Sequence, residues 1–149
     1  MIEVAIGASL LSIAIFTAFS FFRVLIPLDA RTESTIRSDY LLLEAVDVVK
    51  IFRDTSWTTH IASLTTGTPY YLIWDSGDWE ATTTVSVIDG VYYRTVQLDP
   101  VLRDASDDIS TSGTTDAGTL KLTAEVSWLT REGTTTRAVE AYVFDIYAN

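Results

Sequence analysis

The fold of this chain is decided by its first 28 residues, which read MIEVAIGASLLSIAIFTAFSFFRVLIPL (residues 1–28). From Val4 to Phe22, 19 residues, no charged side chain interrupts the run. At about 1.5 Å per residue, a helix of this length reaches roughly the thickness of the hydrocarbon core of a bilayer. The flanking charges of Glu3 and Arg23 cancel, so the formal net charge of -10 belongs to the rest of the chain. We therefore expect residues 1–28 to form a helix that requires an apolar environment.

Three interpretations of this helix are open: a removable secretory signal, a membrane anchor, or a helix that packs against copies of itself. The signal is disfavoured, because signal peptides begin with basic residues and have a shorter apolar core before their cleavage site. An anchor must accommodate Glu3, whose carboxylate is costly near the end of a membrane helix unless it is neutralised. Small residues four positions apart let helix backbones approach closely. They are paired as Ala5 with Ser9, Ala8 with Ser12, and Ala14 with Ala18. This spacing favours close helix–helix packing over an average membrane helix.

The composition of the remaining chain excludes several classes of protein. No cysteine is present, which excludes disulfides, thiol catalysis and cysteine-based metal sites. Setting Glu3 and Arg23 aside from the 20 acidic and 10 basic residues leaves 19 and 9 in residues 29–149. Such an acidic surface repels nucleic acid and anionic headgroups, so we do not expect nucleic-acid binding by this part. Residues 29–149 are enough for one globular domain with its own core.

Residues 29–54 predict a continuation of the helix with a different character. This stretch contains no Gly or Pro, and its apolar residues recur at helical spacing. One face carries Leu42, Ala45, Val46, Val49 and Phe52, and most charged residues lie off it. Pro27 stands at the junction, where it removes a backbone donor and is expected to bend the helix without ending it.

The second half of the chain alternates between apolar and polar residues, as strands do. Thr55 to Gly67 predicts a loop with a short turn, and Asp99 to Gly118 predicts a polar excursion without a core element. The expected strands are Pro69–Trp74, Trp79–Thr84, Val91–Leu98 ended by Pro100, Leu120–Trp128 and Thr134–Tyr147. An antiparallel meander over residues 68–147, covered by the Leu42 to Phe52 face, makes an α+β fold.

This arrangement resembles a type IV pilin or a pseudopilin of type II secretion. The resemblance is carried by Ile2-Glu3-Val4 opening an apolar helix, the proline, the amphipathic continuation and the terminal sheet, and its N-terminal motif covers about a fifth of the chain. A weaker likeness to pilins of candidate-phylum bacteria involves several later segments. These are Arg53 to Trp57, Gly67 to Leu72, Ile88 to Gly90, Arg94 to Val96 and Val126 to Trp128.

The resemblance implies a homo-oligomeric helical filament, held in the cytoplasmic membrane before assembly and extracellular afterwards, with pilus or secretion machinery as partner. It implies surface attachment, motility or DNA uptake as roles. Glu3 is the expected assembly residue, because a carboxylate among apolar helices needs a cation, and the amino group of Met1 of a neighbouring subunit is the nearest. Gly7 and Pro27 mark weak points of the helix. The alternatives are a minor pilin or pseudopilin, and a monomeric membrane-anchored binding module.

The start of the chain departs from the family pattern. Mature pilins carry the glutamate at the fifth position after a basic leader that ends in glycine, whereas here it is Glu3. Arg23, Arg31 and Arg37 all follow the apolar run, which by the positive-inside rule alone would place the large domain in the cytoplasm. A basic leader would reverse that orientation. We therefore expect either a processed form with a shifted start or a chain that lacks its first residues.

Catalytic and metal-binding signals are sparse. His60 is the single histidine, and no Ser-His-Asp order or phosphate-binding glycine loop can be assembled, so an enzyme is not expected. No cofactor is expected either. One candidate for calcium, which prefers oxygen ligands, is the acidic group of Asp104, Asp107, Asp108 and Asp116, but its spacing is not that of an EF-hand and favours a solvated loop. The four tryptophans, Trp57, Trp74, Trp79 and Trp128, are expected in the core ahead of a ligand groove.

Overall fold

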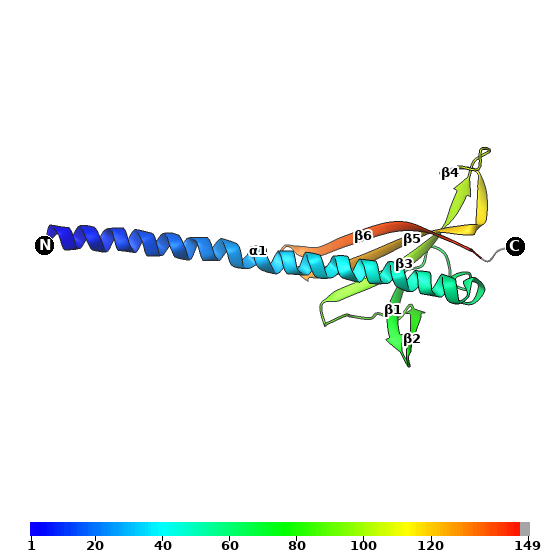
Figure 1. The fold of residues 1–149 in the computed structure, drawn as a ribbon, viewed down its shortest axis with the longest axis horizontal. Coiled ribbons are helices and arrows are strands. Elements are labelled where there is room, and N and C mark those ends of the chain that lie inside the picture. Colours follow the sequence, from blue (N-terminus) through cyan, green and yellow to red (C-terminus); the bar gives the residue numbers. More distant parts are fainter. Residues whose placement is uncertain (147–149) are drawn as a thin grey trace. The chain divides into compact units, whose positions relative to one another are not determined.

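The computed structural model describes residues 1–146, with the backbone alone described for residues 24–30. One long helix is followed by a short π-helix and six strands (Figure 1). The elements are α1 (Ile2–Thr55), η1 (Trp57–Ile61), β1 (Tyr70–Asp75), β2 (Asp78–Thr82), β3 (Tyr92–Arg103), β4 (Ile109–Ser110), β5 (Thr114–Thr130) and β6 (Gly133–Phe144). The α+β fold predicted from the sequence is confirmed. The chain divides into two compact units, Met1–Arg37 and Ser38–Asn149, which are described separately below as the stem and the head.

Helix α1 begins at Ile2 and ends at Thr55, so it does not stop at Pro27. The bend expected at Pro27 falls within residues 24–30, whose side chains are outside the described part of the structure. After the helix ends, the Ser56 backbone is extended and its hydroxyl accepts a hydrogen bond from the Thr59 backbone N–H at 3.2 Å. This cap starts η1, which places Ile61 in the core with no exposed surface. The loop expected between Thr55 and Gly67 therefore contains an ordered turn that contributes to the core.

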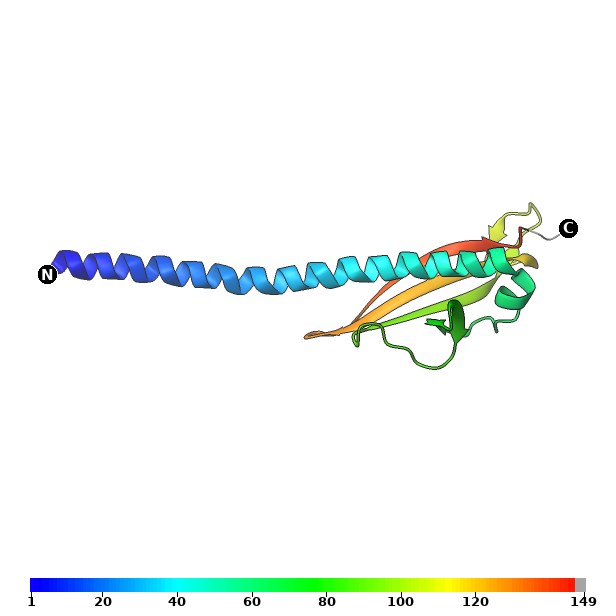
Figure 2. The same cartoon turned by 60° about the horizontal axis from the view of Figure 1, so that its bottom comes forward.

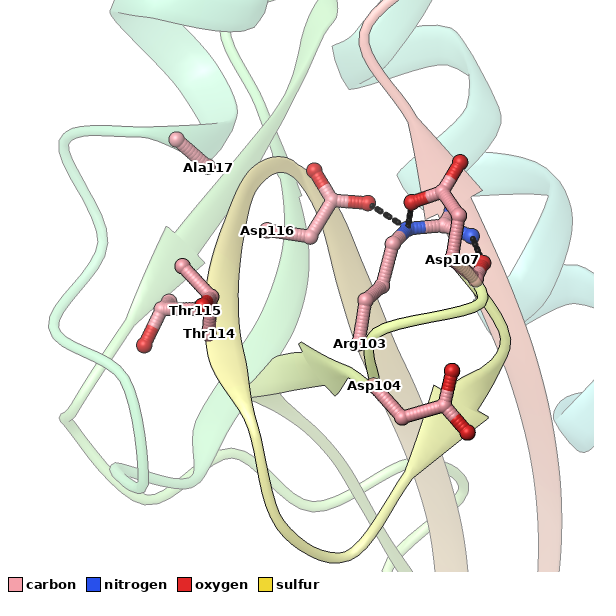
Figure 3. A pocket seen from close by; sticks show the side chains of 7 residues that line it. All are labelled: Arg103, Asp104, Asp107, Thr114, Thr115, Asp116 and Ala117. Carbon is pink, nitrogen blue, oxygen red and sulfur yellow. Dashed lines mark hydrogen bonds and ion pairs between the residues drawn. The ribbon is translucent and has the colours of Figure 1, made fainter.

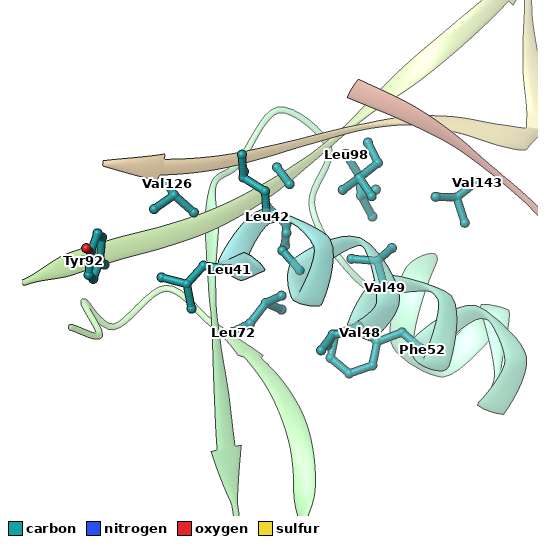
Figure 4. Packing of buried hydrophobic residues seen from close by; sticks show 14 of the residues in the cluster. Leu41, Leu42, Val48, Val49, Phe52, Leu72, Tyr92, Leu98, Val126 and Val143 are labelled. Carbon is teal, nitrogen blue, oxygen red and sulfur yellow. The ribbon is translucent and has the colours of Figure 1, made fainter. Parts of the chain in front are cut away.

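In the head, α1 from Ser38 onward lies along one face of the sheet (Figure 2). The predicted apolar face is confirmed, because Leu42, Ala45, Val49 and Phe52 are buried and Val46 packs against the same cluster. Figure 4 shows Leu42, Val49 and Phe52 together with buried side chains of the strands. The buried strand residues are Leu72, Tyr92, Val96, Leu98, Leu122, Ala124, Val126, Trp128 and Val143. Burial of apolar side chains at about 25 cal/mol per Å² is the main source of stability for such a core.

All strand pairs in the sheet are antiparallel, in the order β2-β1-β3-β5-β6, with β4 paired to β3. The alternation predicted for Leu120 to Trp128 is confirmed, since the even-numbered positions face the helix. The expected meander is wrong at one place. β1 pairs with both β2 and β3, so β2 lies at the edge and residues 83–91 carry the chain back past β1. The connection between β2 and β3 is long enough to pass β1. No sequence pattern within it predicts that β3 pairs with β1 and not with β2.

Two further expectations about the sheet are corrected. Pro100 does not end its strand, because β3 continues to Arg103 through a shift of register between Pro100 and Val101. A proline is tolerated at such an irregularity, where the hydrogen-bond ladder is already interrupted. The polar excursion is also shorter than expected. Its two ends belong to β3 and β5, and Val101 is buried.

Candidate assembly site

The stem presents apolar side chains and no buried ones over its described length. Its Ile2–Arg23 segment has a mean hydropathy of 2.1 and is long and apolar enough to cross a membrane or to act as a signal. None of that segment is buried inside its own chain. The exposed large side chains include Ile2, Val4, Ile6, Leu10, Leu11, Ile13, Ile15, Phe16, Phe19, Phe21 and Phe22. An apolar surface of this extent is a mark of membrane or protein contact.

The hydroxyl groups of the Ile2–Arg23 segment are satisfied within the helix itself. Ser9 donates to the Ile6 carbonyl, and Ser12, Thr17 and Ser20 donate to the carbonyls four residues earlier, at 2.8 to 2.9 Å. An unpaired hydroxyl group is costly in an apolar medium. Because these hydroxyl groups are hydrogen-bonded within the helix, the helix can lie in a bilayer or among other apolar helices. The small-residue positions Ser9 and Ser12 therefore offer little polarity to a neighbouring helix.

Glu3 differs from the serine and threonine side chains that follow it in the Ile2–Arg23 segment. It lies in the first turn of α1 and is exposed, and among the described residues the structure records no partner for its carboxylate. Met1 is exposed next to it, and its carbonyl accepts a hydrogen bond from the Ala5 backbone N–H at 3.3 Å. Gly7 is within the helix, and a Cβ added there would have no neighbour within 4 Å. Of the predicted assembly residues, Pro27 is the one whose side chain is outside the description.

The head also exposes three large apolar side chains on α1, those of Tyr40, Leu43 and Ile51, whereas Leu41, Ala45 and Val48 are buried against the sheet. Since each residue advances the helix by roughly 100°, the exposed set lies about a third of a turn from the buried one. A surface helix ordinarily carries polar residues on its outer face. Here the three apolar side chains lie among the exposed charged side chains of Glu44, Asp47 and Lys50, so they add apolar surface to a face that is otherwise polar.

Two of the acidic residues considered for calcium, Asp104 and Asp116, accept hydrogen bonds from groups of their own chain. Asp116 accepts a hydrogen bond from Arg103 Nε at 2.6 Å and from the Gly118 backbone N–H at 2.9 Å. Asp104 Oδ1 accepts from the backbone N–H groups of Ser106 and Asp108, at 2.8 and 3.1 Å. No group of three metal-binding side chains gathers among the described residues.

These contacts surround an open hollow of about 510 Å³ between β3, β5 and the turn that joins β3 to β4. Figure 3 shows the Arg103 guanidinium between the carboxylates of Asp107 and Asp116. Hydrogen bonds from the Thr119 hydroxyl, from Arg103 and from the Gly118 N–H lower the pKa of Asp116 from 3.8 to about 2. The Arg103 guanidinium therefore forms ion pairs with Asp107 and Asp116 and neutralises part of the acidic charge around the hollow.

The aromatic and histidine residues have mixed positions. Trp128 is buried with its ring tilted by 54° to that of Tyr92, and Trp57 and Trp79 pack partly against the core, as expected. Trp74 was expected in the core, and this is wrong: it is 61% exposed on the β1–β2 hairpin. The β1–β2 hairpin lies at the edge of the sheet, where no further strand among the described residues covers it. His60 is half-buried and stacks on the Phe52 ring with 5.5 Å between centroids, which assigns it a packing role.

Sequence reasoning missed the buried Arg94. Its guanidinium pairs with Glu44 on α1, lies 5.3 Å from the centre of the Trp79 ring and donates to the Leu72 carbonyl at 3.3 Å. A signal was present, because Arg94 is in phase with Tyr92 and with the other inward positions of β3. An arginine at an inward position of a strand predicts a buried ion pair.

No protein-family model, curated protein or solved structure matches this chain. The assignment of a function therefore depends on the residues described above.

Proposed function

We propose that this protein is the structural subunit of an extracellular filament of the type IV pilus kind, assembled through its N-terminal helix. The observation that carries the proposal is the stem, an uninterrupted helix from Ile2 to Arg23 with no side chain buried in its own chain. The hydroxyl groups of this segment are bonded internally, and its two charged side chains, Glu3 and Arg23 at opposite ends, have no recorded partner among the described residues. Such a helix suits a bundle of copies with a specific polar contact at one end.

The exposed apolar side chains on α1 of the head support a bundle over a simple membrane anchor. A lone anchor needs one apolar segment, and the helix beyond it can be polar on its outer face. Here Tyr40, Leu43 and Ile51 remain exposed on the outer face of α1 in the head. In a filament, helices of neighbouring subunits would cover these side chains as well as the stem. The head would then present its acidic, threonine-rich sheet to the solvent.

In this proposal the protein is held in the cytoplasmic membrane by the stem before assembly. Assembly moves the stem from lipid to a bundle of identical stems, and both surroundings are apolar. The amino group of Met1 in a neighbouring subunit is the cation that Glu3 would meet. We infer no catalytic role, since His60 packs on Phe52 and the arginines Arg94 and Arg103 are held in ion pairs.

Electron microscopy of the full-length protein tests the proposal. The protein is purified in detergent, the detergent is removed, and the sample is compared with residues 29–149 prepared in the same buffer. Fibres of uniform width from the full chain, and none from the shorter one, are expected. Disordered aggregates of the full chain would contradict the filament proposal. If the full chain instead stays as monodisperse single particles after transfer from detergent into lipid discs, the membrane-anchored binding module is favoured. A low-copy pseudopilin would instead form short fibres whose length stays limited.

A further inference from the structure

The β1–β2 hairpin holds Trp74 in the solvent in a fixed position. Trp74 lies opposite Trp79 in the strand register, and the two rings meet edge to face at 73° with 5.5 Å between their centroids. Ser76 and Gly77 form the turn with φ angles of 52° and 93°. Trp79 is anchored to the core cluster. Trp74 is therefore a large exposed ring whose orientation is set by its neighbour, which reduces the entropy cost of binding.

The surroundings of Trp74 favour a cationic partner. Residues 61–93 contain four acidic residues and no Lys, Arg or His. Three of the acids, Asp75, Asp78 and Glu80, are exposed on the hairpin itself. A tryptophan face with nearby carboxylates attracts a guanidinium through both the ring and the charges. The same hairpin already shows one such contact, because the Arg94 guanidinium lies 5.3 Å from the centre of the Trp79 ring on the inner side.

Arg131 is the basic side chain of the described head residues for which no ion pair within the chain is recorded. Between Ser38 and Ile146 the bases are Lys50, Arg53, Arg94, Arg103, Lys121, Arg131 and Arg137. All but Arg131 form an ion pair with a carboxylate of the same chain. Within those described residues, Arg131 has no recorded partner, and it is exposed at the turn between β5 and β6. The exposed side chain of Leu129 lies two residues away and adds an apolar surface.

We propose that Arg131 of one copy binds the Trp74 face of the next copy, so that neighbouring heads join through the β5–β6 turn and the β1–β2 hairpin. The two surfaces are different, so the contact is heterologous and continues from copy to copy. It also provides a local attraction between heads that otherwise repel through their excess of acids. The inference rests on the proposed filament, because an open series of such contacts needs the stems to hold the copies together.

Cysteine crosslinking of the full-length protein tests this contact, because the natural chain has no cysteine. The variant Ser76→Cys with Thr134→Cys places one thiol beside each surface. After detergent removal and treatment with a short thiol-reactive crosslinker, a ladder of covalent oligomers is expected on a denaturing gel. Each single-cysteine variant can form dimers at most. A control pair, Ser112→Cys with Thr134→Cys, moves the first thiol to the exposed β4–β5 turn and is expected to give no ladder.

Substitutions in the double-cysteine background separate a specific contact from collisions. Arg131→Glu and Trp74→Ala are each expected to lower the ladder by roughly fivefold, as the loss of an exposed cation–π contact near carboxylates suggests. Arg131→Lys is expected to retain most of it. Asp75→Arg combined with Arg131→Glu restores opposite charges and is expected to recover the ladder. The yield should fall with added salt, since exposed charges are screened.

The outcomes distinguish this contact from the filament itself. Fibres that form normally without a ladder, or with a ladder unchanged in Arg131→Glu, would overturn the head contact and leave the filament proposal intact. A wild-type protein that forms no fibres would overturn both. Fibres with a ladder that depends on Trp74 and Arg131 would support the contact.

Discussion

Arg94 on β3 is paired with Glu44 on α1, although the Arg94 side chain is 3% exposed and that of Glu44 is 46% exposed. The same guanidinium donates to the Leu72 carbonyl on β1 and lies over the Trp79 ring on β2. Its Nε atom is buried without a partner in the described chain. One charged group therefore connects the helix with three neighbouring strands, and Glu44 is the carboxylate that neutralises it.

We expect Glu44→Gln to lower the free energy of unfolding by about 2 kcal/mol, because the Arg94 charge remains buried without a carboxylate. This is less than the loss for a fully buried pair, since water reaches Glu44. Urea unfolding of residues 29–149 measures it. Asp47→Asn is the control, since it breaks the exposed pair with Lys50 and should cost below about 1 kcal/mol. Equal effects of the two variants would show that Arg94 does not depend on Glu44.

Residues 29–149 are expected to be soluble, monomeric and folded. The buried core residues belong to the head, and the fragment lacks the exposed apolar side chains of Ile2–Arg23. Analytical ultracentrifugation and circular dichroism of this fragment test the expectation. If the fragment still assembled into fibres of the native width, the stem would not be the assembly element.

Gly113→Ala is expected to destabilise the head by about 3 kcal/mol. Gly113 has a φ of +140°, and a Cβ there would lie 2.0 Å from the Arg103 carbonyl oxygen, so the backbone of β3 would have to move. Gly133→Ala is the matched control. It has a φ of +122° with nothing within 4 Å of the added Cβ, so it carries backbone strain without the clash. Thermal unfolding of both variants separates the two effects, and a smaller loss in Gly113→Ala than in Gly133→Ala would be contrary to the structure.

The pKa of Asp116 is lowered to about 2 by Thr119, Arg103 and Gly118, against 3.8 for the ordinary side chain. A lowered pKa in the folded state means that the ionised carboxylate stabilises the fold. This contribution is present above about pH 4 and is lost as the pH falls toward 2. Asp116→Asn should therefore melt below the wild type at pH 7 and approach it near pH 2. Asp75→Asn, at an exposed position, serves as the control, and a constant difference between Asp116→Asn and wild type across this range would refute the expectation.

Glu3→Gln and Glu3→Ala are expected to leave the protein folded and membrane-held but to reduce or abolish fibres. Removing one member of a buried ion pair costs on the order of 3–5 kcal/mol, which would apply to each subunit that docks. Fibre number and length by electron microscopy, with protein level and membrane fractionation in parallel, measure the effect. Phe16→Leu is a suitable control, because it conserves an apolar surface on the stem. Normal fibres in both Glu3 variants would show that this carboxylate has no part in assembly.

The sequence by itself was enough for the features that depend on neighbouring residues. The uncharged run from Val4 to Phe22 determined the stem, because length and hydropathy are properties of a single helix. The apolar face from Leu42 to Phe52 and the alternation from Leu120 to Trp128 determined which sides face the core. These periods of about 3.6 and 2 residues are local, so they can be read without knowing the partner.

The tertiary structure alone decided the features that depend on residues far apart in the chain. The edge position of β2, which exposes Trp74, follows from the pairing of β1 with β3. The continuation of β3 beyond Pro100 depends on β5 alongside it, and the pairs Arg94 with Glu44 and Arg103 with Asp116 join different elements. A charged side chain looks the same in a sequence whether its partner is water or a carboxylate 50 residues away. Its role is determined when folding excludes water from the charge and supplies that partner, because only then does an unpaired charge become costly.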